Sequence, residues 1–170
     1  LSILLRSAIY GTSVDIHKNF DENMVNIALN SGEVTLLSVV PTMLERILSI
    51  QPKEIRYPAT IRAVLLGGGP ATPELIRRAQ LQGLPLLQTY GLTEVTSQVS
   101  TVPISDAFER AGSAGLPLLA ATVRLDSGDG HEAAFDEPGQ ILVKGATVTS
   151  GYLQESASAS DKIKEGWLYT

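Results

Sequence analysis

The residues of this sequence with the clearest chemical potential follow a short apolar run. The stretch "LLQTYGLTEVTSQVS", Leu86 to Ser100, places Tyr90 just before the pair Thr93-Glu94. An aromatic ring can stack on a base, a hydroxyl can donate to a phosphate oxygen, and a carboxylate can bind Mg²⁺. A Thr-Glu pair by itself is more often a turn with a solvated carboxylate. The ligand interpretation therefore depends on what lies beside the pair.

A run of three glycines, Gly67 to Gly69, ends another apolar run and precedes Pro70. Backbone amides without side chains can approach a flat or anionic ligand closely. A tight turn without a ligand is an equally good interpretation of the glycines alone. They form neither a Walker loop nor a dinucleotide fingerprint, because both spacings are absent. Beside Thr93-Glu94, however, they favour a ligand site.

Alternating strands and helices are predicted to position these groups. Apolar runs of strand length cover Val34–Val40, Ile61–Pro70 and Leu84–Tyr90, and they are typical of strands buried on both faces of a parallel sheet. Pro41 and Thr72-Pro73 predict the starts of helices between them. The pattern predicts an α/β fold with right-handed βαβ crossovers.

Ligands of open α/β sheets lie beyond the carboxyl ends of the strands. Three such ends are predicted here, at Ser38–Thr42, Gly67–Pro70 and Gln88–Glu94. We expect them to share one edge of the sheet.

The first residues of the chain predict further elements. Leu1–Ile9 has the pattern of an apolar helix, and Ser13–His17 alternates like a strand. Asp21 is a predicted helix N-cap with Phe20 in a staple position, and Gly32 is a predicted helix end.

The pattern changes after Glu94. Strand-like segments separated by Gly, Pro and Asp-Gly turns predict a smaller, β-rich subdomain of distorted barrel-like form. Residues 1–95, 96–151 and 152–170 are the predicted α/β segment, β-rich subdomain and tail, the tail being a loop or helical turn followed by a strand. Asp126–Gly130 lacks the spacing of an EF-hand and predicts a hairpin turn.

Composition excludes several classes of function. The 170 residues are 44% hydrophobic, carry a formal net charge of -5 and include no cysteine. Nucleic-acid binding would need a concentrated basic face, and the sequence shows none. No apolar run has the roughly 20 residues that a membrane span needs. The lack of cysteine fits a reducing compartment, so we expect a cytoplasmic protein. His17 and His131 have no partners at metal-ligand or triad spacing.

Six motifs in order resemble the middle of an AMP-forming acid:CoA ligase of the adenylating superfamily, which includes acyl-CoA synthetases and luciferases. The motifs are "SVVPT", "LLGGGP", "QTYGLTE", "GSAGLP", "GQILVKGATVTSGYL" and "EGWLYT". The resemblance covers essentially the whole chain and implies part of that superfamily's large N-terminal domain. Gln140 is a departure, because relatives usually have Glu there.

The resemblance implies ATP, Mg²⁺ and CoA as cofactor and co-substrates, with a small carboxylic acid as partner. Thr93 would contact the adenylate phosphate and Glu94 would bind Mg²⁺. The implied nucleotide-site residues are Gly67, Gly68, Gly69, Pro70, Gln88, Thr89, Tyr90, Gly91 and Thr93, and the implied acid-site residues are Ser38, Val39, Pro41, Thr42, Leu92, Ser97 and Gln98.

Within the superfamily, the chain is most similar to the o-succinylbenzoate:CoA ligases of menaquinone biosynthesis. Small polar residues such as Ser97, Gln98 and Thr101 would suit an acid with a second carboxylate or a keto group. Another aryl- or fatty acyl-CoA synthetase and a non-catalytic nucleotide-binding or interaction module are the alternatives. An amino-acid-activating domain would need an acyl-pocket aspartate, and none is found in Ser38–Thr42 or Gln88–Ser97.

The resemblance also implies parts outside these residues. The superfamily's phosphate loop is expected before Leu1, and its ribose-binding aspartate and C-terminal domain with a catalytic lysine are expected after Thr170. We therefore expect the 170 residues alone to be inactive, and uncovered sheet edges or apolar helix faces to favour self-association.

Overall fold

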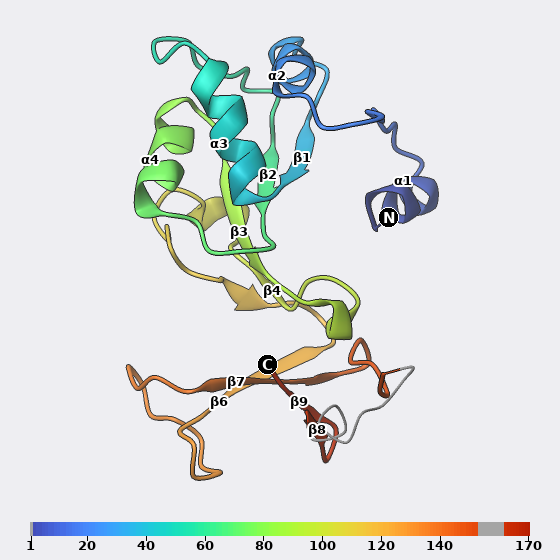
Figure 1. The fold of residues 1–170 in the computed structure, drawn as a ribbon, viewed down its shortest axis with the longest axis vertical. Helices are drawn as coiled ribbons and strands as arrows, with labels where there is room; N and C mark the ends of the chain where they lie inside the picture. Colours follow the sequence, from blue (N-terminus) through green and yellow to red (C-terminus); the bar gives the residue numbers. More distant parts are fainter. Residues whose placement is uncertain (1, 153–161) are drawn as a thin grey trace. The chain divides into compact units, whose positions relative to one another are not determined.

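The computed structural model describes residues 2–152 and 162–170 (Figure 1). The chain divides into two compact units, residues 1–86 and 87–170. Strand β3 (Leu86–Tyr90) begins at the last residue of the first unit.

Helix α2 (Glu22–Asn30) of the first unit begins and ends at the predicted signals. The Asp21 carboxylate accepts from the N–H groups of Asn23 and Met24 at 2.8 and 3.1 Å, which satisfies two backbone donors of the first turn. Phe20 packs against the core beside the helix start, and Gly32 follows the helix end with φ +81°. The capping prediction is confirmed.

Helices α3 (Pro41–Ile50) and α4 (Pro73–Leu81) both begin with proline, whose fixed φ suits the first helical position. Thr72 caps α4 by accepting from the N–H of Leu75 at 3.2 Å. Each helix buries one apolar stripe, as the spacing predicted; the buried residues are Leu44, Ile47, Leu48, Leu75, Ile76 and Ala79.

Strands β1 (Leu36–Val39) and β2 (Ala63–Leu66) are parallel, and α3 lies in the connection between them. This pair confirms the predicted βαβ unit. The core of the unit lies between these strands and helices α2, α3 and α4, which are drawn above, in front of and to the left of the strands in Figure 1.

Two predictions for the first unit are wrong. Leu36 is 60% exposed, so β1 is not buried on both faces. Among the described residues β1 pairs only with β2, which makes it an edge strand. Residues 13–17 form no strand. His17 instead pairs locally with Asp15, with 3.1 Å between Nε2 and Oδ2. The predicted N-terminal helix is present as α1 (Ser2–Tyr10), which lies away from β1 and β2 in both views.

In the second unit, β3 leads into a 3₁₀ turn, η1 (Thr93–Val95). β3 pairs antiparallel with β4 (Ser100–Thr101), and β4 with β5 (Leu116–Pro117). The turn η2 (Ile104–Asp106) lies between these two strands in sequence. The segment "VTSQVSTV", Val95 to Val102, is strand-like in sequence, but Thr96 has φ +70° and breaks the extended backbone after η1.

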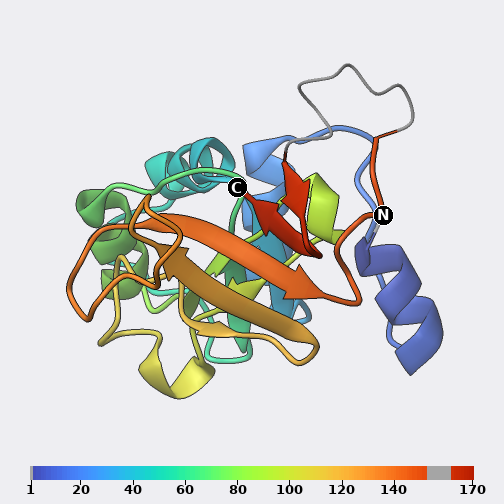
Figure 2. The same cartoon turned by 90° about the horizontal axis from the view of Figure 1, so that it is seen from below.

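A second sheet of the same unit has the order β6-β7-β9-β8. Figure 2 shows its two long antiparallel members, β6 (Ala121–Asp126) and β7 (Gln140–Gly145), side by side. β9 (Trp167–Tyr169) pairs with β7 and with β8 (Ile163–Lys164). The β-rich character predicted for this part is confirmed.

The described part of the predicted tail belongs to this second sheet, because β8 and β9 form a hairpin beside β7. The loop or helical turn predicted before the strand in the tail falls largely in residues 153–161, which lie outside the described residues. The predicted turn at Asp126–Gly130 is present, with Asp126 Oδ1 accepting from the N–H groups of Gly128 and Gly130. In the described part of the chain, no helix has the length and apolarity that crossing a bilayer requires.

Candidate functional site

The carboxyl ends of β1 and β2 lie side by side in the first unit. Val39 is in register with Leu66, and the Gly67 N–H donates to the Val39 carbonyl at 3.3 Å. The residues that follow β1 therefore start beside the glycine run, as expected for two parallel strands of one sheet.

The three glycines have different surroundings. Gly68 has φ +80°, and a Cβ there would lie 3.0 Å from Val40 Cγ1, so both backbone conformation and space favour glycine. A Cβ on Gly69 would meet nothing within 4 Å. Gly69 and Pro70 are exposed, as are Ser38 and Thr42. The loop thus offers accessible backbone, which is the property that a phosphate- or ring-binding loop needs.

Gly91 sits where β3 turns into η1, in the second unit. A Cβ at this position would lie 1.9 Å from the Ser97 carbonyl oxygen and 2.8 Å from Gln98 Cα. Only glycine fits this approach of two backbone segments. Gly91 therefore has a structural reason to be glycine, whatever ligand lies near it.

Gln88 and Tyr90, the residues expected beside the adenine, are both fixed by distant partners within their unit. The Gln88 side-chain carbonyl accepts from the Gly112 N–H. The Tyr90 hydroxyl donates to Thr170 Oγ1 at 2.7 Å, and Thr170 Oγ1 donates to the Ile141 carbonyl at 3.0 Å. These bonds orient the Gln88 amide and hold the Tyr90 ring.

Thr93 and Glu94 occupy the η1 turn, where Thr93 is exposed and Glu94 is half-buried. The Tyr152 hydroxyl donates to Glu94 Oε1 at 2.7 Å. This hydrogen bond, followed by one from the backbone N–H of Glu94, lowers the pKa of Glu94 below its ordinary value, and the same pair raises the pKa of Tyr152. At neutral pH the carboxylate is therefore ionised and the phenol is protonated.

The chemistry of this carboxylate fits Mg²⁺. The ion prefers oxygen ligands and commonly takes one or two carboxylates, with waters and substrate phosphates completing its octahedron. A carboxylate has about four lone-pair sites, so Glu94 can accept from Tyr152 and still bind a cation. No group of three or more His, Asp or Glu side chains suited to a metal occurs among the described residues. Mg²⁺ bound by Glu94 would fit this preference with water and phosphate oxygens as its other ligands.

The candidate acid-site residues of the second unit flank the same turn. Ser97 is exposed and Gln98 is half-buried, while Leu92 packs against the apolar cluster around Val95 and Val99. Thr101 Oγ1 is buried without a hydrogen-bond partner among the described residues.

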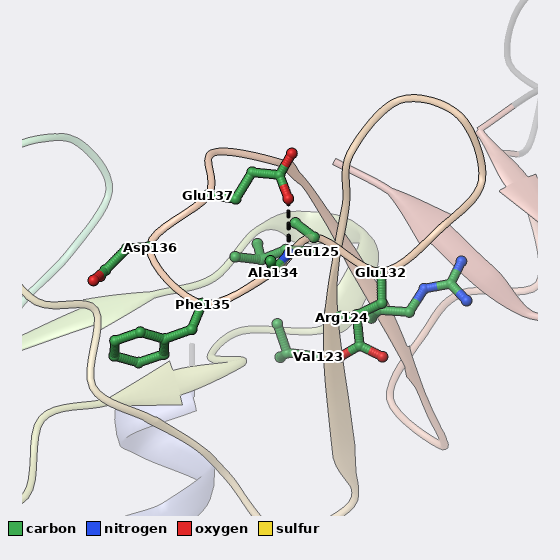
Figure 3. A pocket seen from close by; sticks show the side chains of 9 residues that line it. Val123, Arg124, Leu125, Glu132, Ala134, Phe135, Asp136 and Glu137 are labelled. Carbon is green, nitrogen blue, oxygen red and sulfur yellow. Dashed lines mark hydrogen bonds between the residues drawn. The ribbon is translucent and has the colours of Figure 1, made fainter.

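A separate hollow of about 500 Å³ opens along β6 and residues 132–137 (Figure 3). Phe135 lies at the rim of this hollow and is 96% exposed. The lining segment is held by a hydrogen bond in which the Ala134 N–H donates to Glu137 Oε2 at 2.8 Å. None of the site residues predicted from the sequence lines it.

Sequence reasoning missed two residues that contact Glu94. Tyr152 reaches its carboxylate from 58 positions along the chain, and the Thr149 N–H donates to its backbone carbonyl at 2.7 Å. The sequence feature that could have pointed to Tyr152 was the "SGYL" segment, which ends the longest of the six motifs. The pairing itself follows only from the fold.

Residues 2–153 match the family described as AMP-binding enzyme, and the chain belongs to this family. The fold and this match thus define the class of protein as an AMP-binding enzyme.

Curated relatives of this chain include several 2-succinylbenzoate–CoA ligases. The 2-succinylbenzoate–CoA ligases of Geobacillus sp. (strain WCH70) and Bacillus licheniformis are 42% and 41% identical over all 170 residues, which cover 34% and 35% of those proteins. Among solved structures, the o-succinylbenzoate CoA synthetase of Bacillus subtilis in complex with the acyl-adenylate intermediate OSB-AMP matches with a TM-score of 0.88 and 37% identity. That match covers 99% of this chain and 34% of the synthetase.

The same synthetase solved with ATP and magnesium ion matches with a TM-score of 0.87, over 99% of this chain and 35% of that one. The N-terminal domain of FACL13 from Mycobacterium tuberculosis, at 23% identity and a TM-score of 0.83 over 99% of this chain and 43% of that one, shares the fold. The chain spans about a third of the length of the curated relatives it matches.

Proposed function

We propose that these 170 residues form the central part of an AMP-forming acid–CoA ligase that activates o-succinylbenzoate for menaquinone biosynthesis. The observation that carries the proposal is the match along 99% of the chain, at 37% identity, to a synthetase whose structure contains OSB-AMP. The Glu94 site adds independent support, since an ionised carboxylate beside an exposed threonine suits Mg²⁺ and a nucleotide phosphate.

The first step would form an acyl-adenylate. A carboxylate oxygen of the acid attacks the α-phosphorus of ATP, the bond from that phosphorus to the bridging oxygen breaks, and pyrophosphate leaves. Catalysis of this step depends mainly on positioning and on neutralising charge at the phosphoryl oxygens. The Thr93 hydroxyl would donate to a phosphate oxygen, and Glu94 would hold the Mg²⁺, which supplies positive charge beside the phosphates.

Two sets of residues would bind the nucleotide. Gly67 to Pro70 would present backbone to the adenine and acyl groups. Gln88 and Tyr90 would flank the base, with Thr89 and Gly91 completing the strand end. The hydrogen bonds from Gly112 to Gln88 and from Tyr90 to Thr170 support these roles, because they hold both side chains in one orientation.

In the second step, the CoA sulfur would attack the acyl carbonyl carbon. The thiol proton passes to the solvent, the thioester bond forms, and AMP leaves as its bond to the acyl carbon breaks. None of the described side chains is assigned to this step.

The choice of acid would depend on two further sets of residues. Ser38, Val39, Pro41 and Thr42 would line the acyl site, together with Leu92, Ser97 and Gln98. Exposed or half-buried polar side chains such as Ser97 and Gln98 suit an acid that carries a second carboxylate or a keto group.

Acid-dependent ATP–pyrophosphate exchange by the complete ligase tests the substrate. We expect o-succinylbenzoate to support exchange far better than benzoate or hexanoate, because neither of these carries a second polar group for Ser97 and Gln98. Preference for hexanoate would favour a fatty acyl-CoA synthetase, and preference for benzoate another aryl-CoA synthetase. Nucleotide binding without exchange with any acid would favour a non-catalytic module.

Glu94→Gln tests the metal role. The amide keeps the size of the side chain but removes the charge, so we expect exchange to fall on the order of 100-fold. Glu54→Gln, a change at an exposed glutamate of the first unit, serves as the matched control and should exchange like the unmodified ligase. An unchanged rate in Glu94→Gln would refute the Mg²⁺ role.

A further inference from the structure

The Glu94 carboxylate is held by a residue far along the chain. The Tyr152 hydroxyl donates to Glu94 Oε1 at 2.7 Å, and both side chains are half-buried in the same unit. A hydrogen bond to an ionised acceptor is stronger than one between neutral groups. The bond therefore restrains the rotation of a side chain that would otherwise sample several rotamers.

Tyr152 is itself positioned by a small turn after β7. The Thr149 hydroxyl donates to the Gly151 carbonyl at 3.0 Å and lies 3.4 Å from the Gly151 N–H. Thr149 thus sets the backbone just before Tyr152, so the phenol enters the site from a fixed direction.

The same turn holds the backbone of η1. The Thr149 N–H donates to the Glu94 carbonyl at 2.7 Å, and the Thr96 hydroxyl donates to the Thr147 carbonyl at 3.1 Å. Beside these bonds, Val148 packs against the apolar cluster that contains Val95, which is 1% exposed. Residues 147–152 therefore support Glu94 through its backbone, through its neighbours and through its carboxylate.

We propose that Tyr152 is a positioning residue for Glu94, and that its hydroxyl orients the carboxylate for Mg²⁺ in the nucleotide complex. The inference rests on the proposed function, because it takes Glu94 as the Mg²⁺ ligand. Tyr152 touches neither metal nor substrate in this role. It acts by reducing the reorientation that Glu94 undergoes when the cation arrives, as hydrogen-bond partners of metal ligands generally do.

The test measures ATP binding by calorimetry to the complete ligase at increasing Mg²⁺ concentration, without the acid, so that no turnover occurs. We expect Tyr152→Phe to raise the Mg²⁺ concentration for half-maximal enhancement of ATP binding about tenfold. Exchange by Tyr152→Phe should recover at high Mg²⁺, because the ligand itself is intact. Tyr169→Phe, which removes a hydroxyl from β9, is the matched control and should bind as the unmodified ligase does.

A double variant separates positioning from a general effect on the fold. If Tyr152 acts through the Glu94 charge, Tyr152→Phe should add no further Mg²⁺ shift in a Glu94→Gln background. An equal shift in both backgrounds, or a loss of melting temperature without a Mg²⁺ shift, would overturn the inference.

The two proposals fail differently. If Glu94→Gln shifts the Mg²⁺ dependence and Tyr152→Phe does not, the positioning role is overturned and the proposed function stands. If neither variant shifts it, the Mg²⁺ role of Glu94 is refuted and the inference fails with it.

Discussion

At the residue scale, two of the glycines differ in whether the fold itself requires them. A Cβ on Gly91 would lie 1.9 Å from the Ser97 carbonyl oxygen, whereas a Cβ on Gly69 would meet nothing within 4 Å. Both residues belong to motifs that resemble the adenylating superfamily. Only Gly91 is demanded by the packing of the chain itself.

Gly91→Ala should therefore destabilise the protein, by about 3 kcal/mol or more, because the turn into η1 must open to admit the methyl group. Gly69→Ala should leave the free energy of unfolding nearly unchanged, because the added methyl group meets no other atom. It should weaken ATP binding, because the methyl group projects from the exposed loop that is proposed to approach the nucleotide. Chemical unfolding and nucleotide titration measure the two effects. Equal stability of both variants would contradict the close backbone approach at Gly91.

At the element scale, helix α2 depends on a single charged cap. Asp21 accepts from two backbone N–H groups, Met24 first in its effect and Asn23 second, and these bonds lower the pKa of the carboxyl below its ordinary value. A lowered folded-state pKa means that the ionised cap stabilises the helix at pH values above the ordinary pKa. That contribution is lost as the pH falls through the folded-state pKa.

Asp21→Ala should lower the melting temperature at pH 7 and reduce the difference in melting temperature between pH 7 and pH 3. Asp21→Asn keeps a side-chain acceptor for the cap, so it should retain most of the stability at pH 7 with the same weaker pH dependence. Thermal unfolding followed by circular dichroism across this range measures both. A pH dependence unchanged in either variant would show that Asp21 does not contribute to it.

At the scale of the whole molecule, the surface of the first unit carries many exposed large apolar side chains. Its exposed large apolar side chains include Ile3, Leu4, Leu5, Ile9, Met24, Ile27 and Leu36. Such a surface favours association or coverage by another segment, because water is displaced from apolar groups on contact. The chain spans about a third of the length of its curated relatives, and we propose that further residues of such a ligase cover these side chains.

The 170 residues prepared alone should therefore self-associate with rising concentration and show no ATP–pyrophosphate exchange. Light scattering and the exchange assay measure these properties. Replacing Ile27 and Leu36 with Ser should reduce the association, because both side chains are more than half exposed. A monomer at every concentration tested would contradict the first expectation, and robust exchange the second.

Much of the local structure was predictable because it depends on residues a few positions apart. Apolar spacing placed α3 and α4, and the cap at Asp21 placed α2, since helical bonds and capping bonds join residues within one turn. The strand predicted at Ser13–His17 was wrong because alternation does not supply the partner that a strand requires.

The βαβ pattern, the β-rich second half and the motifs typical of an AMP-binding enzyme could all be predicted from the amino-acid sequence. The groups that hold the candidate site residues became known only from the folded chain: Tyr152 on Glu94, Gly112 on Gln88 and Thr170 on Tyr90. These partners lie 58, 24 and 80 positions away. Their contacts depend on strand register and turn geometry, which no local interaction fixes.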